Sequence, residues 1–263
     1  MDRIITRLGF AEEDSKLLHD RRGTAFYKIG DTALKITSGL MAGREGEILD
    51  LLGNETYRAH GWDGERSWLT LRWINGTDLW TALEQAHQRE DSTATRHHVL
   101  AMTADAAHEL TELHAAGWIH GDLQPDHIIF ADDRTHLIDL ACAQGPAKVP
   151  FYVHRGGLAH TTAPEIADLI LSSDGHVTTT PQADIWSLGA SLWWSWTRTT
   201  PIAYTDPAGR RAALLADIAA ARRPDPTAVR PWPFPAFEDA VMACLAADPD
   251  KRPTAKELAT TLL

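Results

Sequence analysis

The pattern of apolar residues changes once along the chain, near residue 75, and this change constrains the fold more than any other feature. Alternating and β-branched runs typical of strands precede it, at residues 24–29, 32–37 and 67–73. Longer patterns with helical spacing follow it, at residues 95–115, 184–196 and 212–221. We therefore expect an α+β chain, with residues 1–74 rich in sheet and residues 75–263 mainly helical.

Three further segments refine this expectation. Residues 41–52 carry apolar side chains at helical spacing, so one helix is expected within the sheet-rich region. Thr254 and Glu257 form a capping-box pattern, which predicts the start of a last helix. Residues 223–237 contain five prolines. Because proline lacks an N–H donor and has a fixed φ, this segment is expected to be a loop.

Composition excludes several classes of function. With 36 acidic and 25 basic residues, the chain gives nucleic acid little electrostatic attraction. The most apolar stretch, residues 185–196, is too short to cross a bilayer, and residues 1–10 lack the apolar core of a secretory signal. The two cysteines, Cys142 and Cys244, stand far apart, which is typical of a reducing compartment. We expect a cytoplasmic protein without nucleic-acid or membrane partners.

The chemistry of the chain is concentrated between residues 119 and 141. Asp122 lies in a polar loop after a helical pattern, and Asp139 follows a short apolar strand. An aspartate in such a loop can accept the proton of a hydroxyl group, and a second one can hold Mg²⁺ on nucleotide phosphates. Phosphoryl transfer requires both a proton acceptor and a metal ligand.

This stretch resembles the catalytic loop and the metal-binding triplet of protein kinases, with Asp122 as catalytic base and Asp139 as magnesium ligand. Further landmarks of that family occur in the family's order: Ala33-Leu34-Lys35, Glu45, Ala163-Pro164-Glu165, residues 184–189 and residues 248–253. The resemblance covers nearly the whole chain. It implies a bacterial Ser/Thr-kinase-like protein with a two-lobed fold, a sheet-rich N-lobe, a helical C-lobe and ATP in the cleft between them.

The resemblance also implies a set of nucleotide contacts. Lys35 would reach the phosphates and Glu45 would hold its ammonium group. Strand alternation puts Ala33 on the same face as Lys35, where a small side chain leaves room for adenine. The remaining expected contacts are the backbone of Arg72 and Ile74 with the adenine edge, Asp78 with the ribose, and Ile129 in the adenine floor. Within the helical lobe, Glu165 and Arg252 would form an ion pair.

Several positions depart from the family pattern. Gln124 replaces the lysine that neutralises the transferring phosphate, and a neutral amide stabilises developing charge less well. His127 replaces the asparagine that holds a second magnesium, and imidazole suits softer metals. We retain both as candidate catalytic residues and His127 also as a candidate metal ligand; a structural histidine is the alternative. Gly121 replaces an arginine, and Gly23 is the lone glycine where the family has a glycine-rich loop.

The leading hypothesis is an enzyme that uses ATP and Mg²⁺ to phosphorylate a hydroxyl group, that of Ser or Thr in a protein or a precursor peptide. A precursor peptide would imply a partner lyase that eliminates the phosphate. Gln124, His127 and the missing glycines leave open a pseudokinase that acts as a binding or allosteric partner. His120-Gly121-Asp122 also resembles aminoglycoside phosphotransferases, which leaves open a small-molecule kinase.

Overall fold

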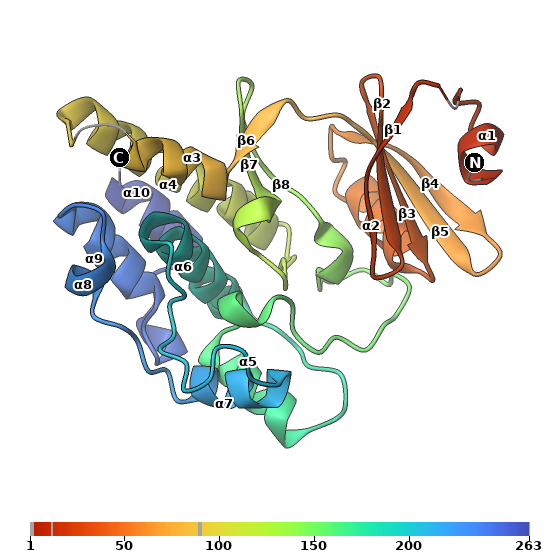
Figure 1. The fold of residues 1–263 in the computed structure, drawn as a ribbon. Coiled ribbons are helices and arrows are strands. Elements are labelled where there is room, and N and C mark those ends of the chain that lie inside the picture. Colours follow the sequence, from red (N-terminus) through yellow and green to blue (C-terminus); the bar gives the residue numbers. More distant parts are fainter. Residues whose placement is uncertain (1–2, 12, 89–90, 263) are drawn as a thin grey trace. The chain divides into compact units, whose positions relative to one another are not determined.

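The computed structural model describes residues 3–11, 13–88 and 91–262, which form two compact units (Figure 1). The first unit comprises Met1–Asn75, Leu140–Ala143 and Ala147–Phe151. The second unit comprises Gly76–Asp139, Gln144–Pro146 and Tyr152–Leu263. The N-terminal region is rich in sheet and the C-terminal region is helical, so the predicted α+β class is confirmed.

The first unit is built on a five-stranded antiparallel sheet with the strand order β1-β2-β3-β5-β4. Its elements are α1 (Arg3–Arg7), β1 (Ser15–Arg21), β2 (Thr24–Ile29), β3 (Thr32–Ser38), α2 (Met41–Leu51), β4 (Tyr57–Asp63) and β5 (Arg66–Arg72). The central strand β3 is buried over nearly its whole length. Its side chains alternate between the two faces of the sheet, which gives each face its own set of partners.

One face of β3 belongs to the apolar core of the first unit. Leu34 and Ile36 pack in a cluster with Ile4 and Ile5 of α1 and with Ile29 of β2. Alternation sends Ala33 and Lys35 to the other face, where Lys35 meets a side chain of α2. The helix α2 contacts β3, β4 and β5, and it thereby forms a second layer on the sheet.

The two edge strands, β1 and β4, were not predicted from the sequence. Most residues of β1 are exposed, so its sequence lacks the alternation of a half-buried strand. The hairpin from β1 to β2 turns at Arg22 and Gly23, both with positive φ, 54° and 76°. This is the geometry of a tight two-residue turn, and it occupies the place where the family resemblance implies a longer glycine-rich loop.

The second unit is mainly helical and holds a small antiparallel sheet with the order β6-β7-β8. Its strands are β6 (Gly76–Asp78), β7 (Ile128–Ala131) and β8 (Thr135–Leu137). Its helices are α3 (Leu79–His87), α4 (Thr93–Ala115), α5 (Pro164–Ser172), α6 (Pro181–Thr197), α7 (Arg211–Ala219), α8 (Pro226–Val229), α9 (Pro235–Cys244) and α10 (Ala255–Leu262). Short 3₁₀ turns lie at Pro125–His127, Leu140–Cys142, Ala159–Thr161 and Pro249–Lys251, the second of them in the first unit.

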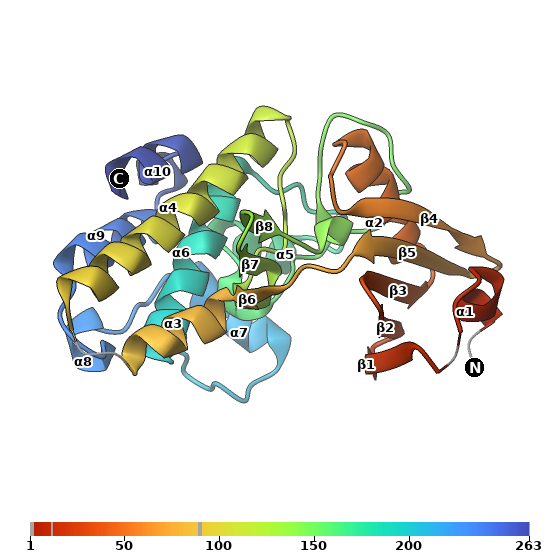
Figure 2. The same cartoon turned by 90° about the horizontal axis from the view of Figure 1, so that it is seen from above.

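The helix α6 forms the core of the second unit. It contacts α3, α4 and α9, while α10 lies against α4 (Figure 2). Trp186, Trp193 and Trp196 are buried on α6, so they serve packing. Thr180 caps the helix by accepting a hydrogen bond from the Ala183 amide at 3.1 Å.

The prediction of a continuous loop at residues 223–237 is wrong. The segment contains α8, and α9 begins at Pro235. Proline is well tolerated in the first turn of a helix, because the N–H group that it lacks has no intrahelical partner there. Prolines that exclude a helix interior can therefore mark a helix start.

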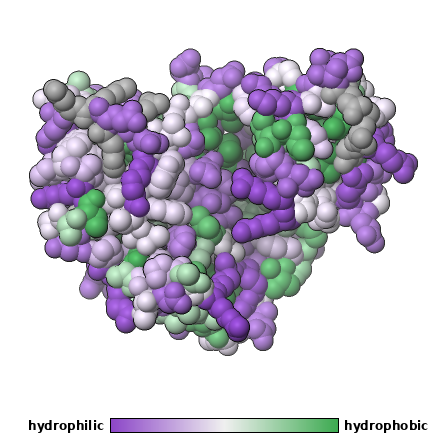
Figure 3. All heavy atoms as spheres, viewed as in Figure 1, coloured by the Kyte–Doolittle hydropathy of each residue, from purple (hydrophilic) through white to green (hydrophobic). Residues whose placement is uncertain are grey.

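The surface of the described residues is mixed in polarity. Hydrophilic side chains cover much of the face in Figure 3, and apolar side chains gather in small groups between them. Among the helices of the described residues, none combines the length and the apolar character needed to span a membrane.

Candidate active site

The first unit contains a buried ion pair between β3 and α2. Lys35 Nζ lies 2.8 Å from Glu45 Oε2, and the side chains are 10% and 3% exposed. An ordinary surface pair is thereby excluded. Ala33, two residues before Lys35 and on the same face, is also buried. A small residue and a fixed cation thus lie side by side on this face of the sheet.

Arg44, the neighbour of Glu45, attaches α2 to the chain that follows Asp139. Its Nε donates to the carbonyl of Ala141 at 3.0 Å and its Nη1 to that of Pro150 at 3.1 Å, while its Nη2 donates to the carbonyl of Ala143. Arg44 is buried, and all these partners belong to the first unit. One guanidinium group therefore holds α2 to residues 141–150.

Arg72 and Ile74 lie at and just after the end of β5. The Arg72 amide donates to the carbonyl of Thr56 at 2.7 Å, so its N–H group is committed within the first unit. Its side chain lies 3.7 Å from Glu55, and the two side chains are 35% and 52% exposed. Surface pairs of this kind add little to stability.

In the second unit, Asp184 holds the backbone of the loop that contains Asp122. Its carboxylate accepts hydrogen bonds from the amides of His120 at 2.7 Å and Gly121 at 3.0 Å, and it lies 3.0 Å from His114 Nε2. Gly121 has a positive φ of 75°. A left-handed conformation disfavours an arginine here, so the departure from the family pattern agrees with the local backbone.

His120 is a structural residue of this loop. Its Nε2 bonds the carbonyl of Ile138 at 3.0 Å, and its Nδ1 accepts the Asp122 amide at 3.3 Å. Burial lowers the pKa of His120, which favours the neutral ring that these two bonds require. The ring also stacks on His127, with 5.9 Å between centroids.

Asp122 is a half-buried carboxylate in contact with a distant backbone segment. Its Oδ1 accepts a hydrogen bond from the Leu158 amide at 2.9 Å. Desolvation raises the pKa of Asp122, whereas the electrostatic influence of His127 and the hydrogen bond from the Leu158 amide lower it. A carboxylate with a raised pKa is a better proton acceptor than an ordinary surface aspartate.

Gln124, His127 and Asp139 are also brought together in the second unit. His127 Nδ1 bonds the carbonyl of Asp122 at 2.8 Å, so Nδ1 carries the proton and Nε2 of the neutral ring is an acceptor. The Gln124 amide lies 3.1 Å from this Nε2, and Asp139 Oδ2 lies 3.7 Å from it. Once the Gln124 amide turns away from it, this imidazole nitrogen could share a divalent cation with the Asp139 oxygen.

Asp139 has an unusual backbone conformation. Its φ is 60°, and its side chain is 36% exposed. Aspartate enters this left-handed region more readily than most residues, but such conformations are concentrated at functional sites. The 3₁₀ turn Pro125–His127 is linked to this segment, since the Ile138 amide donates to the carbonyl of His127 at 3.0 Å.

Asp78 and Ile129 face each other across β6 and β7. The Asp78 carboxylate accepts hydrogen bonds from the Thr81 amide at 2.8 Å and from the Thr81 hydroxyl at 3.0 Å, so it caps α3. Contact between Asp78 and a ribose stays a prediction. In the structure, the Asp78 carboxylate caps α3. Ile129 is partly buried.

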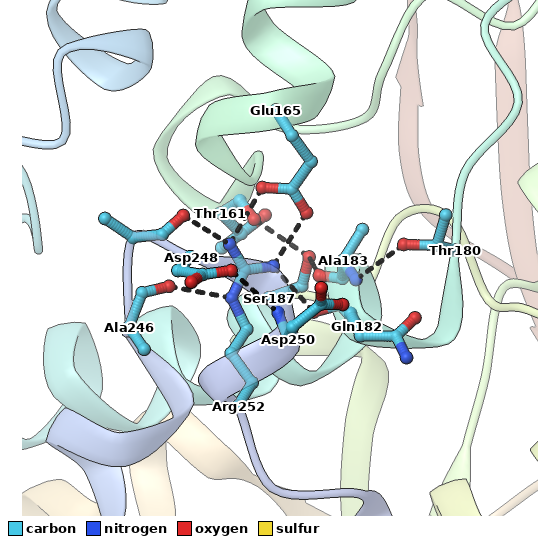
Figure 4. Close-up of polar contacts among 11 residues, drawn as sticks. Thr161, Glu165, Thr180, Gln182, Ala183, Ser187, Ala246, Asp248, Asp250 and Arg252 are labelled. Atoms are coloured by element: carbon cyan, nitrogen blue, oxygen red, sulfur yellow. Dashed lines mark hydrogen bonds and ion pairs between the residues drawn. The ribbon is translucent and has the colours of Figure 1, made fainter.

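Glu165 and Arg252 form a two-point ion pair (Figure 4). The distances are 2.7 Å for Nη1 to Oε1 and 2.8 Å for Nη2 to Oε2, and the Arg252 side chain is fully buried. Arg252 also donates to the carbonyls of Gln182 and Ala246, each at 2.9 Å. The pair joins α5, α6 and the turn before α10, which makes it part of the scaffold.

Two residues of this site had no role predicted from the sequence. Asp184 could have been noticed, because a carboxylate in the first turn of a very apolar helix needs buried donors. Gly157 gave no signal. A Cβ atom there would lie only 1.8 Å from Asp122 Oδ1, and this closeness arises only when residues far apart in the chain fold together.

Comparison with known proteins agrees with this arrangement. Residues 56–262 match the family model described as "Protein kinase domain", a match that begins after Lys35 and Glu45. Serine/threonine-protein kinase PAK 4 of Homo sapiens is 29% identical over 128 residues, which cover 48% of this chain and 20% of that protein.

Two further relatives carry similar names. Proto-oncogene serine/threonine-protein kinase mos of Sus scrofa is 29% identical over 165 residues, 60% of this chain and 45% of that protein. Serine/threonine-protein kinase PknE of Mycobacterium tuberculosis is 27% identical over 188 residues, 70% of this chain and 30% of that protein. The chain thus spans less than half the length of each of these relatives.

Proposed function

Because this chain belongs to the protein kinase family, we propose that it transfers the γ-phosphoryl group of ATP to the hydroxyl group of Ser or Thr in a protein or a precursor peptide. The observation that carries the proposal is the grouping of Asp122, His127 and Asp139 in one unit. It combines a proton acceptor of raised pKa with a pair of metal ligands. Phosphoryl transfer needs both functions.

Asp122 is proposed as the general base. The Leu158 amide occupies Oδ1 and fixes the plane of the carboxylate, so Oδ2 is the atom that would accept the proton of the substrate hydroxyl. Burial of the carboxylate raises its pKa and strengthens it as a base. His127 supports this geometry by donating to the Asp122 carbonyl.

Asp139 and His127 are proposed to hold the divalent cation. A partly exposed carboxylate fits Mg²⁺, and the Nε2 acceptor of His127 at 3.7 Å adds a nitrogen ligand that fits Mn²⁺ better. When bound, such an ion would neutralise charge on the nucleotide phosphates.

The nucleotide contacts of the first unit centre on Lys35. The Glu45 carboxylate restricts its ammonium group to one direction, so its charge is available to phosphates without a cost of ordering on binding. We further propose the remaining expected contacts of ATP: Ala33, the backbone of Arg72 and Ile74, Asp78, and Ile129. For Asp78 the ribose contact would require an exchange of its capping bonds to Thr81.

Gln124 is proposed as a weak electrostatic catalyst. Its amide is turned toward His127 Nε2 at 3.1 Å, and a neutral amide stabilises the transferring phosphoryl group less than an ammonium group does. We therefore expect slow transfer. Relatives named as serine/threonine kinases support a protein hydroxyl as acceptor. A cytoplasmic location, where ATP is supplied, and a partner lyase acting on a phosphorylated precursor peptide are further parts of the proposal.

A pseudokinase is the second candidate. The specific observation in its favour is the contact between Gln124 and His127, which together replace two of the family's charge-stabilising and metal-binding groups. Such a protein would bind a partner and transfer no phosphoryl group.

Transfer of label from [γ-³²P]ATP to Ser/Thr peptides, with Mg²⁺ or Mn²⁺, separates these functions. The proposal expects labelled phosphoserine or phosphothreonine with the wild type, and a rate lower by about 10² or more for Asp122→Asn. Asp126→Asn is the matched control, because Asp126 is an exposed aspartate of the same loop. ATP binding without transfer to peptides or to the chain itself would favour the pseudokinase, and transfer only to small alcohols would favour a small-molecule kinase.

A further inference from the structure

The peptide group between Gly157 and Leu158 has an ionic partner at each end. Its N–H group donates to Asp122 Oδ1 at 2.9 Å, and its carbonyl oxygen accepts a hydrogen bond from Arg211 Nη2 at 3.3 Å. Arg211 is the first residue of α7 and lies in none of the kinase-like motifs. One peptide group therefore links an exposed arginine to the proposed catalytic base, entirely within the second unit.

The contact depends on the absence of a side chain at Gly157. A Cβ atom there would lie 1.8 Å from Asp122 Oδ1 and 2.4 Å from its Cγ. The φ of Gly157 is outside the left-handed region, so the requirement comes from the close approach of the carboxylate and not from the backbone conformation.

The same peptide segment is fixed on its other sides. The Leu158 carbonyl accepts hydrogen bonds from the hydroxyls of Thr161 at 3.2 Å and Thr162 at 3.0 Å. Arg211 Nη2 also donates to the Arg155 carbonyl at 2.9 Å. The Arg155 side chain in turn donates to the Ile170 carbonyl, in α5, at 2.7 Å. The Leu158 amide is thus presented to Asp122 by an ordered segment.

Hydrogen bonds at the two ends of a peptide group strengthen each other. A cation at the carbonyl oxygen polarises the group and makes its N–H a better donor, and a carboxylate at the N–H has the matching effect on the oxygen. The arginine and the aspartate are thereby coupled although their side chains do not touch each other.

We infer that Arg211 is a positioning residue for Asp122, acting through the 157–158 peptide group. The inference rests on the proposed function of Asp122 as base. Arg211 keeps Oδ1 bound to the Leu158 amide, so that Oδ2 faces the substrate hydroxyl.

The sequence allows this peptide group to be observed almost alone. Only two Gly–Leu peptide bonds occur in the chain, Gly39–Leu40 and Gly157–Leu158. A protein labelled with ¹³C at the glycine carbonyl and ¹⁵N at leucine therefore gives two signals in a carbonyl–amide correlation spectrum. One signal reports both ends of the 157–158 peptide group, and the other serves as internal control; Leu40→Val assigns them.

Arg211→Ala is expected to move the Gly157 carbonyl and the Leu158 amide proton upfield together. Solvent exchange of the Leu158 amide should accelerate roughly two- to tenfold, the value of one net hydrogen bond. Asp122→Ala should move the amide proton in the same direction. In Arg211→Ala, kcat should fall by a similar factor with little change in the KM for ATP, and Arg211→Lys should restore part of the loss.

Arg210→Ala is the matched control. Arg210 is also exposed and adjacent in sequence, and in the described structure only Arg211 of the two donates to the 155–158 segment. The inference is overturned if Arg211→Ala moves the carbonyl signal alone and leaves the Leu158 proton, its exchange and kcat at wild-type values. If the chain transfers no phosphoryl group but both Leu158 readouts respond to Arg211 and Asp122, the proposed function fails and the positioning stands.

Discussion

Lys35 on β3 and Glu45 on α2 form an ion pair of 2.8 Å in which both side chains are almost completely withdrawn from water. Removing two charges from water costs several kcal/mol for each ion, and their attraction offsets this cost only while both are present. The pair therefore contributes little as a stabilising element. Instead, the pair holds the Lys35 ammonium group in one fixed direction.

Lys35→Met should consequently do more than remove a phosphate contact. It deprives the buried Glu45 carboxylate of its cation, and the free energy of unfolding should fall by about 3–5 kcal/mol. The double variant Lys35→Met/Glu45→Leu should recover a large part of that loss, because no isolated charge is left inside. Urea unfolding of the three proteins measures both effects. Equal stability of the wild type and Lys35→Met would show that the pair is open to water.

Arg44→Ala tests the attachment of α2 to residues 141–150. The buried guanidinium group serves the carbonyls of Ala141, Ala143 and Pro150. Its removal should lower the free energy of unfolding by about 2–4 kcal/mol, since carbonyls bonded to a charged donor lose that partner. Amide exchange in residues 140–151 should accelerate at the same time. Arg58→Ala, which breaks an exposed pair with Asp31, should change stability by less than about 1 kcal/mol. Similar losses in both variants would contradict the account.

Asp122→Asn should stabilise the fold at neutral pH. Burial raises the pKa of Asp122 in the folded protein, so the folded state binds its proton more tightly than the unfolded chain does. This carboxylate therefore lowers stability as pH rises from about 4, the pKa in an unfolded chain, through its raised folded pKa. Asparagine removes that cost and keeps an oxygen acceptor for the Leu158 amide. Thermal unfolding midpoints between pH 4 and 8 should diverge with rising pH, whereas Asp126→Asn should follow the wild type. Curves that stay parallel would argue against a desolvated Asp122.

His127→Asn should change the preferred metal ion. The nitrogen ligand at position 127 favours Mn²⁺ over Mg²⁺, and an amide oxygen in its place should lower the ratio of the two affinities by about tenfold. Titration of each metal in the presence of a non-hydrolysable ATP analogue gives that ratio directly. An unchanged ratio would mean that His127 is not a ligand and only supports the loop through the Asp122 carbonyl.

The sequence was informative where the structure depends on local patterns. The interior strands β2, β3 and β5 were predicted because they carry apolar and β-branched residues, and the helix α2 was predicted because its apolar residues recur at helical spacing. The edge strands β1 and β4 were missed because neither buries a regular apolar face: β1 exposes Leu17 and Leu18, and β4 exposes Trp62. The start of α9 was missed because prolines at a helix N-terminus look like prolines in a loop.

In the candidate site, too, some residues could be predicted from local sequence motifs and other contacts could not. Asp122 and Asp139 lie in short motifs that can be recognised along the chain. The contacts that shape them come from Asp184, the Leu158 amide and Arg211, each more than thirty residues away in sequence from Asp122. No local pattern encodes a backbone amide that meets a carboxylate across such a separation, so these contacts required the folded structure.

The binding of ATP is the most direct test of the central claim. Calorimetric titration of ATP into the wild type and Asp139→Ala, with Mg²⁺, with Mn²⁺ and without metal, should show metal-dependent binding that weakens at least about tenfold in the variant. Binding of this kind would establish that Asp139 works with a nucleotide and a metal as a phosphotransfer site requires. An absence of ATP binding to the wild type with either metal would contradict the proposed enzyme.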